Sequence, residues 1–164
     1  MSETVDIFQV LKDLNILYEK QEHKAIFSEE DSKDVVITLG GTDVKNLFVK
    51  DKNKNYGLVS MDLHKRADLK KIAEQFGFGR LSFCNPDELM QYLNITPGSV
   101  TPLCIMFDTE KQVKVLYDQN FEGKKVIIHP LRNTASISIG FEDLKRFTEH
   151  FGHTWQLGDI YKNE

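Results

Sequence analysis

The feature that most restricts the fold is a pair of short apolar stretches, residues 45–50 and 56–61, on either side of a polar turn. The first stretch has the apolar centre Leu47, Phe48 and Val49 between polar ends. The turn, residues 51–55, contains only Asp, Asn and Lys, and Gly57 follows it closely. Two short apolar stretches joined by a short polar turn predict a β-hairpin. A β-sheet therefore belongs in any fold proposed for this chain.

The rest of the chain alternates between helical and extended patterns without a regular βαβ rhythm. Helices are expected from Thr4 to Leu14, from Ser28 onward, from Asp68 to Gly77, from Asn85 to Asn94, and over 141–151 with Gly152 as the cap. Extended segments are expected at 16–22, 35–39, 81–83, 126–129 and 135–139, with a second hairpin formed by 103–107 and 113–117. This order predicts an α+β fold with a mixed, mostly antiparallel sheet and flanking helices.

The length of 164 residues fits one domain, 1–164, and the sequence contains no internal repeat or linker-like tract. Folding at this length buries about 70% of the unfolded surface, so neither a metal nor a disulfide is required. The N-terminus has no basic stretch followed by an apolar run, and no apolar stretch approaches about 20 residues. We therefore expect a cytoplasmic protein with no membrane partner.

The residues most often used in catalysis or metal binding form few convincing patterns. Cys84 and Cys104 lie among apolar residues and predict reduced, buried thiols, with a catalytic cysteine as the alternative. His150 and His153 lack a third ligand nearby in sequence, which disfavours zinc. Phosphate-binding Gly-rich loops, a GxSxG motif and a dinucleotide fingerprint are missing from the sequence, so we expect no cofactor.

Positive charge is concentrated in one part of an acidic chain. The net charge is −4, which disfavours a general DNA binder, yet residues 45–80 carry nine basic and four acidic side chains. That segment is therefore +5 and the remainder −9. The distribution suits docking of one short anionic element, although a solvated charged face would give the same count.

Lys45 is the first candidate for a functional residue. In the predicted hairpin it shares a face with Leu47 and Val49, whereas Asn46, Phe48 and Lys50 occupy the other. A lysine among apolar neighbours either extends outward from the rim or holds an anion or carbonyl in a pocket. The pattern alone leaves both interpretations open.

Two further segments contain candidate residues. Gly98 lies between Pro97 and Pro102 in a predicted loop, whose backbone N–H groups could hold a carbonyl or a developing oxyanion; an ordinary rigid turn is the alternative. His129 ends a predicted strand before Pro130 and could bind a ligand, line a pocket or act as a base, although a lone histidine can equally be structural.

Taken in order, these segments resemble the YbaK/ProX family of aminoacyl-tRNA deacylases, which are related to the editing domain of bacterial prolyl-tRNA synthetase. The resemblance covers nearly the whole chain. Its motifs are Lys45-Asn-Leu-Phe-Val-Lys-Asp51, Leu81-Ser-Phe83, Pro97-Gly-Ser-Val-Thr-Pro102, His129-Pro130, Asn133-Thr-Ala-Ser136 and Phe141-Glu-Asp-Leu-Lys-Arg-Phe147 with Gly152-His153. Asp43 and Val44 depart from the family, where His and Thr are frequent, and touch the edge of the predicted pocket.

The resemblance implies a sheet curled around a pocket and hydrolysis of the ester between an amino acid and the terminal adenosine of tRNA. It makes Lys45 the essential lysine, Asn46 its polar neighbour, and His129 the pocket histidine. Gly98 to Pro102 matches the family's GxxxP loop. The remaining expected contacts are Ser99 and Ser136 with the substrate, and Lys50 and Arg80 with the tRNA.

The family mechanism implies that the 2′-hydroxyl of the tRNA helps to activate or position water, while the protein orients the substrate and supports charge. Free-standing relatives of this length resemble alanyl-tRNA(Pro) deacylases, with prolyl-tRNA synthetase as a further possible partner. Cys-tRNA(Pro) and Ser- or Thr-charged tRNAs are alternative substrates. A non-catalytic tRNA- or synthetase-binding module is the alternative from a different functional class.

Overall fold

The computed structural model describes residues 5–26, 33 and 35–162. Its α-helices are α1 (Ile7–Asp13), α3 (Leu69–Phe76), α4 (Pro86–Leu93) and α5 (Phe141–His150). Three short 3₁₀ helices are η1 (Pro97–Ser99), η2 (Pro102–Phe107) and η3 (Gln119–Phe121). The strands are β1 (Glu19–Glu22), β2 (Thr42–Lys50), β3 (Tyr56–Asp62), β4 (Ser82–Phe83), β5 (Val113–Asp118), β6 (Lys125–Ile128), β7 (Ala135–Gly140) and β8 (Trp155–Gly158).

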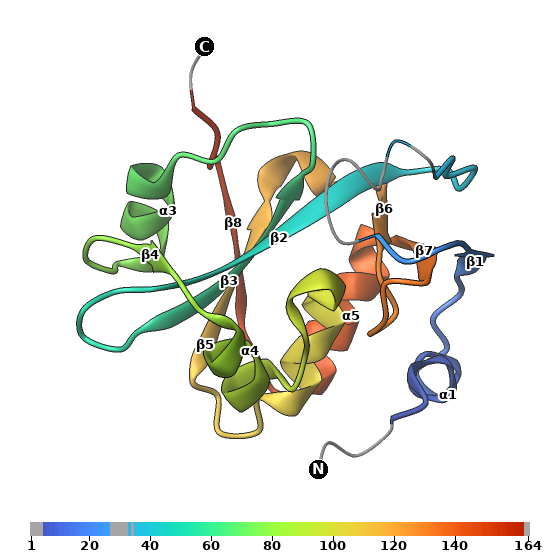
Figure 1. Cartoon of the computed structure of the whole chain (residues 1–164), viewed down its shortest axis with the longest axis horizontal. Helices are drawn as coiled ribbons and strands as arrows, with labels where there is room; N and C mark the ends of the chain where they lie inside the picture. The colour runs from blue at the N-terminus through green and yellow to red at the C-terminus, as the bar shows by residue number, and fades with distance from the viewer. Residues whose placement is uncertain (1–4, 27–32, 34, 163–164) are drawn as a thin grey trace.

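The eight strands form one sheet in the order β1-β7-β6-β2-β3-β5-β8, with β4 paired to β2 outside this path (Figure 1). Four strand pairs are antiparallel, and three are parallel: β2 with β6, β3 with β5, and β5 with β8. Helices flank the sheet (Figure 1). The predicted α+β class with a mixed, mostly antiparallel sheet is confirmed. The assignment of residues 1–164 to one domain stays a prediction.

Polar caps explain where several helices begin. Asp6 accepts hydrogen bonds from the N–H groups of Phe8 and Gln9, and Asp68 caps α3 in the same way. Asn85 and Glu88 form a reciprocal capping box at the start of α4, as the sequence predicts. The expected cap Thr4 and the helix expected from Ser28 lie outside the described residues.

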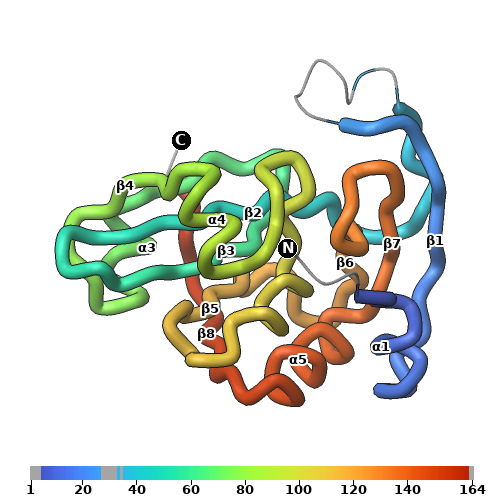
Figure 2. Tube along the Cα trace, turned by 60° about the horizontal axis from the view of Figure 1, so that its bottom comes forward, coloured from blue at the N-terminus to red at the C-terminus, as the bar shows by residue number. Residues whose placement is uncertain are grey.

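Strand β2 joins two parts of the sheet (Figure 2). Its start pairs with β6 at Thr42–Val126 and Asp43–Ile127, whereas its end pairs with β4 at Val49–Phe83 and Lys50–Ser82. On its opposite edge β2 pairs with β3 from Val44 to Lys50, which confirms the predicted hairpin. Between the contacts with β6 and β4, the edge of β2 over residues 44–47 has no strand partner in the described part of the chain, and Phe48 O accepts a hydrogen bond from Cys84 N–H.

Two expectations about strands were wrong, and one strand was missed. Residues 103–107 do not form a hairpin with 113–117: they lie in η2, where Pro102 opens the helix and the Thr101 side chain accepts a hydrogen bond from Leu103 N–H. Val113–Asp118 instead pairs in parallel with β3 and β8. Residues 35–39 form no strand, and strand β8 was not expected at all.

Two apolar clusters lie on the two faces of the β2–β3 hairpin. Phe48 and Leu58 belong to the first, together with Ile128 and Ile137 from β6 and β7. Val49, Val59 and Met61 belong to the second, which α3 covers through Ile72 and Phe76. In the described part of the chain, no helix has both the length and the apolar character needed to cross a bilayer.

Candidate functional site

Strand registers place Lys45, His129 and Ser136 on one face of the sheet. Lys45 and His129 each lie two residues beyond the parallel pair Asp43–Ile127. Continuing the antiparallel register Ile128–Ile137 by one residue sets His129 opposite Ser136. Since paired residues share a face and successive residues alternate, all three side chains leave the face that carries Leu47 and Val49. The structure thus brings together three of the residues that the sequence singled out.

His129 is fixed by its own hairpin. Its Nδ1 lies 3.0 Å from the carbonyl oxygen of Ala135, which can only accept, so Nδ1 carries the proton. Burial, with a smaller contribution from the nearby His23 imidazole, lowers the pKa of His129 below its usual value. His129 is therefore neutral at physiological pH, and its Nε2 is a hydrogen-bond acceptor.

His23 is a neighbour of this group that the sequence did not single out. It follows β1, its Nε2 lies 2.9 Å from Ser136 Oγ, and its ring centroid is 6.3 Å from that of His129. Its position in a polar stretch after the extended segment 16–22 gave no sign of this contact. Only the pairing of β1 with β7 brings His23 to Ser136.

Asn46 leaves the opposite face of β2 and holds the loop around Gly98. Its Nδ2 donates to Val100 O at 3.1 Å, and its Oδ1 accepts from Ser60 Oγ at 2.6 Å. The Ser99 N–H donates to Thr96 O at 3.0 Å within this loop. The structure therefore does not group Gly98 and Ser99 with Lys45 on one face; Asn46 connects the loop to the neighbouring position of the same strand.

Lys50 lies farther along β2 and is already paired. Its Nζ is 2.8 Å from both carboxylate oxygens of Glu88, whose Oε2 also accepts from Tyr56 Oη. The Glu88 carboxylate raises the pKa of Lys50, and Lys50 in turn lowers the pKa of Glu88. A ligand that contacts Lys50 would therefore contact the Lys50–Glu88 ion pair and not a free lysine.

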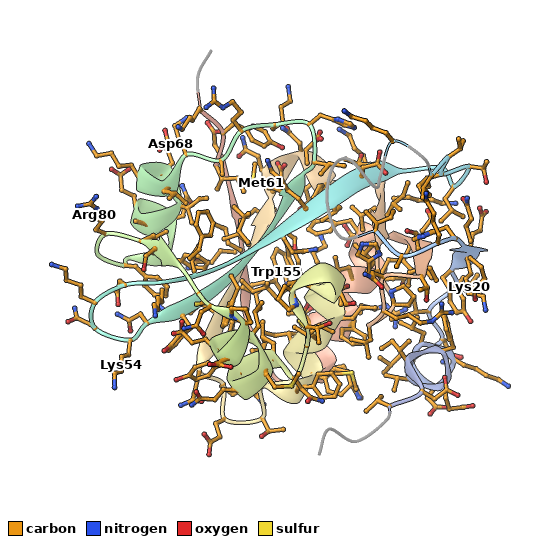
Figure 3. The ribbon with its side chains drawn as sticks, in the orientation of Figure 1. Lys20, Lys54, Met61, Asp68, Arg80 and Trp155 are labelled. Carbon is orange, nitrogen blue, oxygen red and sulfur yellow. The ribbon has the colours of Figure 1, made fainter. Side chains whose placement is uncertain are left out.

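A surface cavity of about 630 Å³ surrounds this ion pair. Its lining includes the basic side chains Lys50, Lys52, Lys54 and Arg80 and the acidic side chains Asp51 and Glu88. Asp51 accepts hydrogen bonds from Asn53, Asn55 and Gly79, and Glu88 pairs with Lys50. Lys54 and Arg80 extend outward at the same end of the molecule (Figure 3). The cavity is thus a basic surface whose acidic members are already engaged.

Cys84, Cys104 and His153 do not suggest a second reaction centre. Burial raises the pKa of Cys104 to about 12, and burial together with the Glu88 carboxylate raises the pKa of Cys84 to about 12. Both are then thiols at neutral pH and poor nucleophiles. His153 is buried against Asp108 with Nε2 and Oδ2 2.9 Å apart. Within the described residues, no group of three or more His, Cys, Asp or Glu side chains is placed to hold a metal.

Comparison with known proteins identifies the family of the chain. Residues 23–147 match the model of the aminoacyl-tRNA editing domain family. The chain is 33% identical over 152 residues to the prolyl-tRNA editing protein ProX of Acetoanaerobium sticklandii, covering 92% of this chain and 93% of that protein. It is 34% identical over 161 residues to the prolyl-tRNA synthetase associated domain-containing protein 1 of Bos taurus, covering 94% of each.

A solved structure shares the fold at lower sequence identity. It is described as "a putative trans-editing enzyme for prolyl tRNA synthetase", with a TM-score of 0.72 and 18% identity, and the match covers 99% of this chain and 100% of that one. The family model matches well over half of the chain, and the relatives align along nearly all of it. The expected resemblance and the expected enzyme class, aminoacyl-tRNA deacylase, are confirmed at the level of the family. The chain belongs to the aminoacyl-tRNA editing domain family.

Proposed function

We propose that the protein is a trans-editing enzyme that hydrolyses mischarged tRNA, with Ala-tRNA(Pro) as its substrate. The observation that carries this proposal is the placement of Lys45, His129 and Ser136 on one face of the sheet, beside the unpaired edge of β2. A cation, a neutral imidazole and a hydroxyl are suited to bind and orient an aminoacyl ester, because such an ester presents carbonyl, amine and phosphate groups together.

The reaction needs little acid–base machinery from the protein. The aminoacyl ester is already activated, and the adjacent 2′-hydroxyl of the terminal adenosine can help to position or activate water. Lys45 would hold the phosphate or the carbonyl of the substrate and support the charge that develops on the carbonyl oxygen. Asn46 would hold the Gly98 loop in place, and contact of the Gly98 and Ser99 backbone with the aminoacyl end stays a prediction.

The basic cavity is our candidate for the tRNA contact. Lys45 and Lys50 are five residues apart on one strand, or about 16 Å. A nucleic acid strand whose 3′ end lies at Lys45 could therefore place its backbone near the cavity. Arg80, together with Lys52 and Lys54, supplies positive charge there, and Lys50 lines the same cavity as the partner of Glu88. Phosphate contacts of this kind position a nucleic acid without reading its sequence.

The first test is deacylation of a panel of tRNAs by the wild type and by Lys45→Ala. We expect release of alanine from Ala-tRNA(Pro) by the wild type. The loss of one preorganised charge contact should lower kcat/KM by about 100-fold or more in Lys45→Ala. Lys12→Ala on helix α1 is the matched control and should retain wild-type turnover.

The outcomes separate the remaining possibilities. Preferred turnover of Cys-tRNA(Pro), or of Ser- or Thr-charged tRNA, would keep the reaction and change the substrate. Binding of tRNA without deacylation above background would identify a non-catalytic module. Equal turnover by Lys45→Ala and the wild type would remove Lys45 from the mechanism.

A further inference from the structure

Three polar side chains meet where β1, β6 and β7 lie side by side. His23 is held at the end of β1 by a hydrogen bond from its N–H to Thr134 O, at 2.9 Å. Its Nε2 contacts Ser136 Oγ at 2.9 Å, and its ring lies edge-on to that of His129 at 6.3 Å. His23 thus lies against both the Ser136 hydroxyl and the His129 ring.

Main-chain carbonyls determine which ring nitrogens carry protons. His23 Nδ1 lies 2.7 Å from Lys24 O, and His129 Nδ1 lies 3.0 Å from Ala135 O. A carbonyl oxygen only accepts, so in the neutral form of either ring Nδ1 would be the donor and Nε2 the acceptor. In that form His23 Nε2 accepts the Ser136 hydroxyl proton, which leaves the lone pairs of Ser136 Oγ available.

The cluster therefore presents acceptors to a ligand. Ser136 Oγ offers lone pairs, and His129 Nε2 has no hydrogen-bond partner among the residues that the structure describes. A carbonyl or phosphate oxygen could not bind here, because it brings no proton. An ammonium group brings three donors, whereas a hydroxyl brings one, so the ammonium is the group that can satisfy both acceptors at once.

We propose that Ser136 and His129 bind the α-ammonium group of the aminoacyl ester, with His23 as the positioning residue that orients the Ser136 hydroxyl. This inference rests on the proposed function and restricts its substrate to esters that carry a free amine. The ester carbonyl would then lie toward Lys45. The ammonium group would contact hydrogen-bond acceptors, and the carbonyl group would contact a cation.

The electrostatics of the cluster agree with a cationic ligand. Burial lowers the pKa of His129, which keeps its ring neutral and removes the repulsion that an imidazolium would exert on an ammonium group. A Ser–His pair could also suggest a nucleophile and its base. However, the group behind His23 is the uncharged Lys24 carbonyl, which orients the ring but supplies no counter-charge to an imidazolium.

The test uses tRNA acceptor-stem duplexes that end in 3′-amino-3′-deoxyadenosine, joined by a stable amide to either alanine or lactate. The two ligands differ only in an ammonium or a hydroxyl at the α-carbon. Equilibrium titration should show that the wild type binds the alanyl duplex about tenfold more tightly, as expected for a hydrogen bond to a charged group. His23→Ala should reduce this preference to about twofold or less without changing the affinity for the lactyl duplex.

Two matched variants complete the test. His23→Gln should restore part of the preference, because its amide oxygen can accept the Ser136 proton. His150→Ala, which removes an exposed histidine at the end of α5, should keep the wild-type preference.

The inference is overturned if the wild type binds the two duplexes equally or binds neither. It is also overturned if His23→Ala weakens both ligands to the same degree, since that result would indicate a purely structural role. If the preference for the alanyl duplex disappears when the terminal adenosine lacks its 2′-hydroxyl, the donor bound at this site is the ribose hydroxyl. That result would also overturn the inference. Deacylation by the wild type can be intact in each case, so these failures are distinct from failure of the proposed function.

Discussion

At the scale of single residues, Asp51 shows how one carboxylate organises the basic end of the molecule. Its two oxygens accept hydrogen bonds from the N–H groups of Asn53, Asn55 and Gly79 and from Asn55 Nδ2, at 2.9–3.1 Å. These bonds, led by the Asn55 side chain, lower the pKa of Asp51 from its usual 3.8 to about 2. The same carboxylate thus shapes the β2–β3 turn and ties it to the segment before Arg80.

This arrangement makes stability depend on pH in a defined window. The pKa of Asp51 is lower in the folded state, so its stabilising effect is complete above about pH 4 and is lost as the pH falls toward 2. Urea unfolding should show Asp51→Asn less stable than the wild type at neutral pH, with the difference closing in that window. Asp13→Asn on helix α1 is the control. A difference that stays constant down to pH 2 would contradict the assignment.

At the scale of elements, the contact between β3 and α3 leaves no room for a side chain at Gly57. A Cβ placed there would lie 2.5 Å from Cε2 of Phe76. Gly57→Ala should therefore lower the free energy of unfolding by about 1–3 kcal/mol, the usual cost of overpacking a core. Gly40→Ala, where a Cβ meets nothing within 4 Å, is the control. Denaturant unfolding measures both, and adding Phe76→Leu should recover part of the loss if the clash is its cause.

Local signals predicted the elements that depend on local chemistry. The β2–β3 hairpin follows from two apolar stretches around a polar turn, and helix α4 from a capping box, each contained within about twenty residues. The sequence predicts a strand for the run after Pro102 because the run is apolar and short, properties that a buried 3₁₀ helix shares. Parallel pairing of β5 with β3 and β8 joins segments that are distant in sequence, so no local sequence pattern next to β5 predicts it.

At the scale of the whole molecule, an acidic chain carries a basic cavity at one end, and this charge separation should appear in tRNA binding. Arg80→Ala should raise KM for a mischarged tRNA with little change in kcat. It should also reduce the slope of log affinity against log salt by about one counterion. Lys20→Ala, at the opposite end of the molecule in Figure 3, is the control. An unchanged salt slope for Arg80→Ala would exclude a phosphate contact.

The candidate site was predictable in part. Lys45, His129 and Ser136 could be chosen from motifs because each lies in a distinctive segment, and the sheet then places them on one face. His23 could not be chosen in this way, because its role depends on the β1–β7 pairing. The separation of Asn46 from Lys45 across β2 follows from strand alternation, and only the hydrogen bond to Val100 shows what Asn46 holds.

The position of β2 between two parts of the sheet has a consequence for fidelity. Lys45 is on β2, whereas His129 and Ser136 come from the β6–β7 side, and the second apolar cluster supports β2 from the β3 side. Local unfolding of either part would separate these groups, so a partly opened molecule should be inactive rather than less selective. The harmful error of such an enzyme is hydrolysis of a correctly charged tRNA. Loss of all activity on partial unfolding is therefore safer than loss of selectivity.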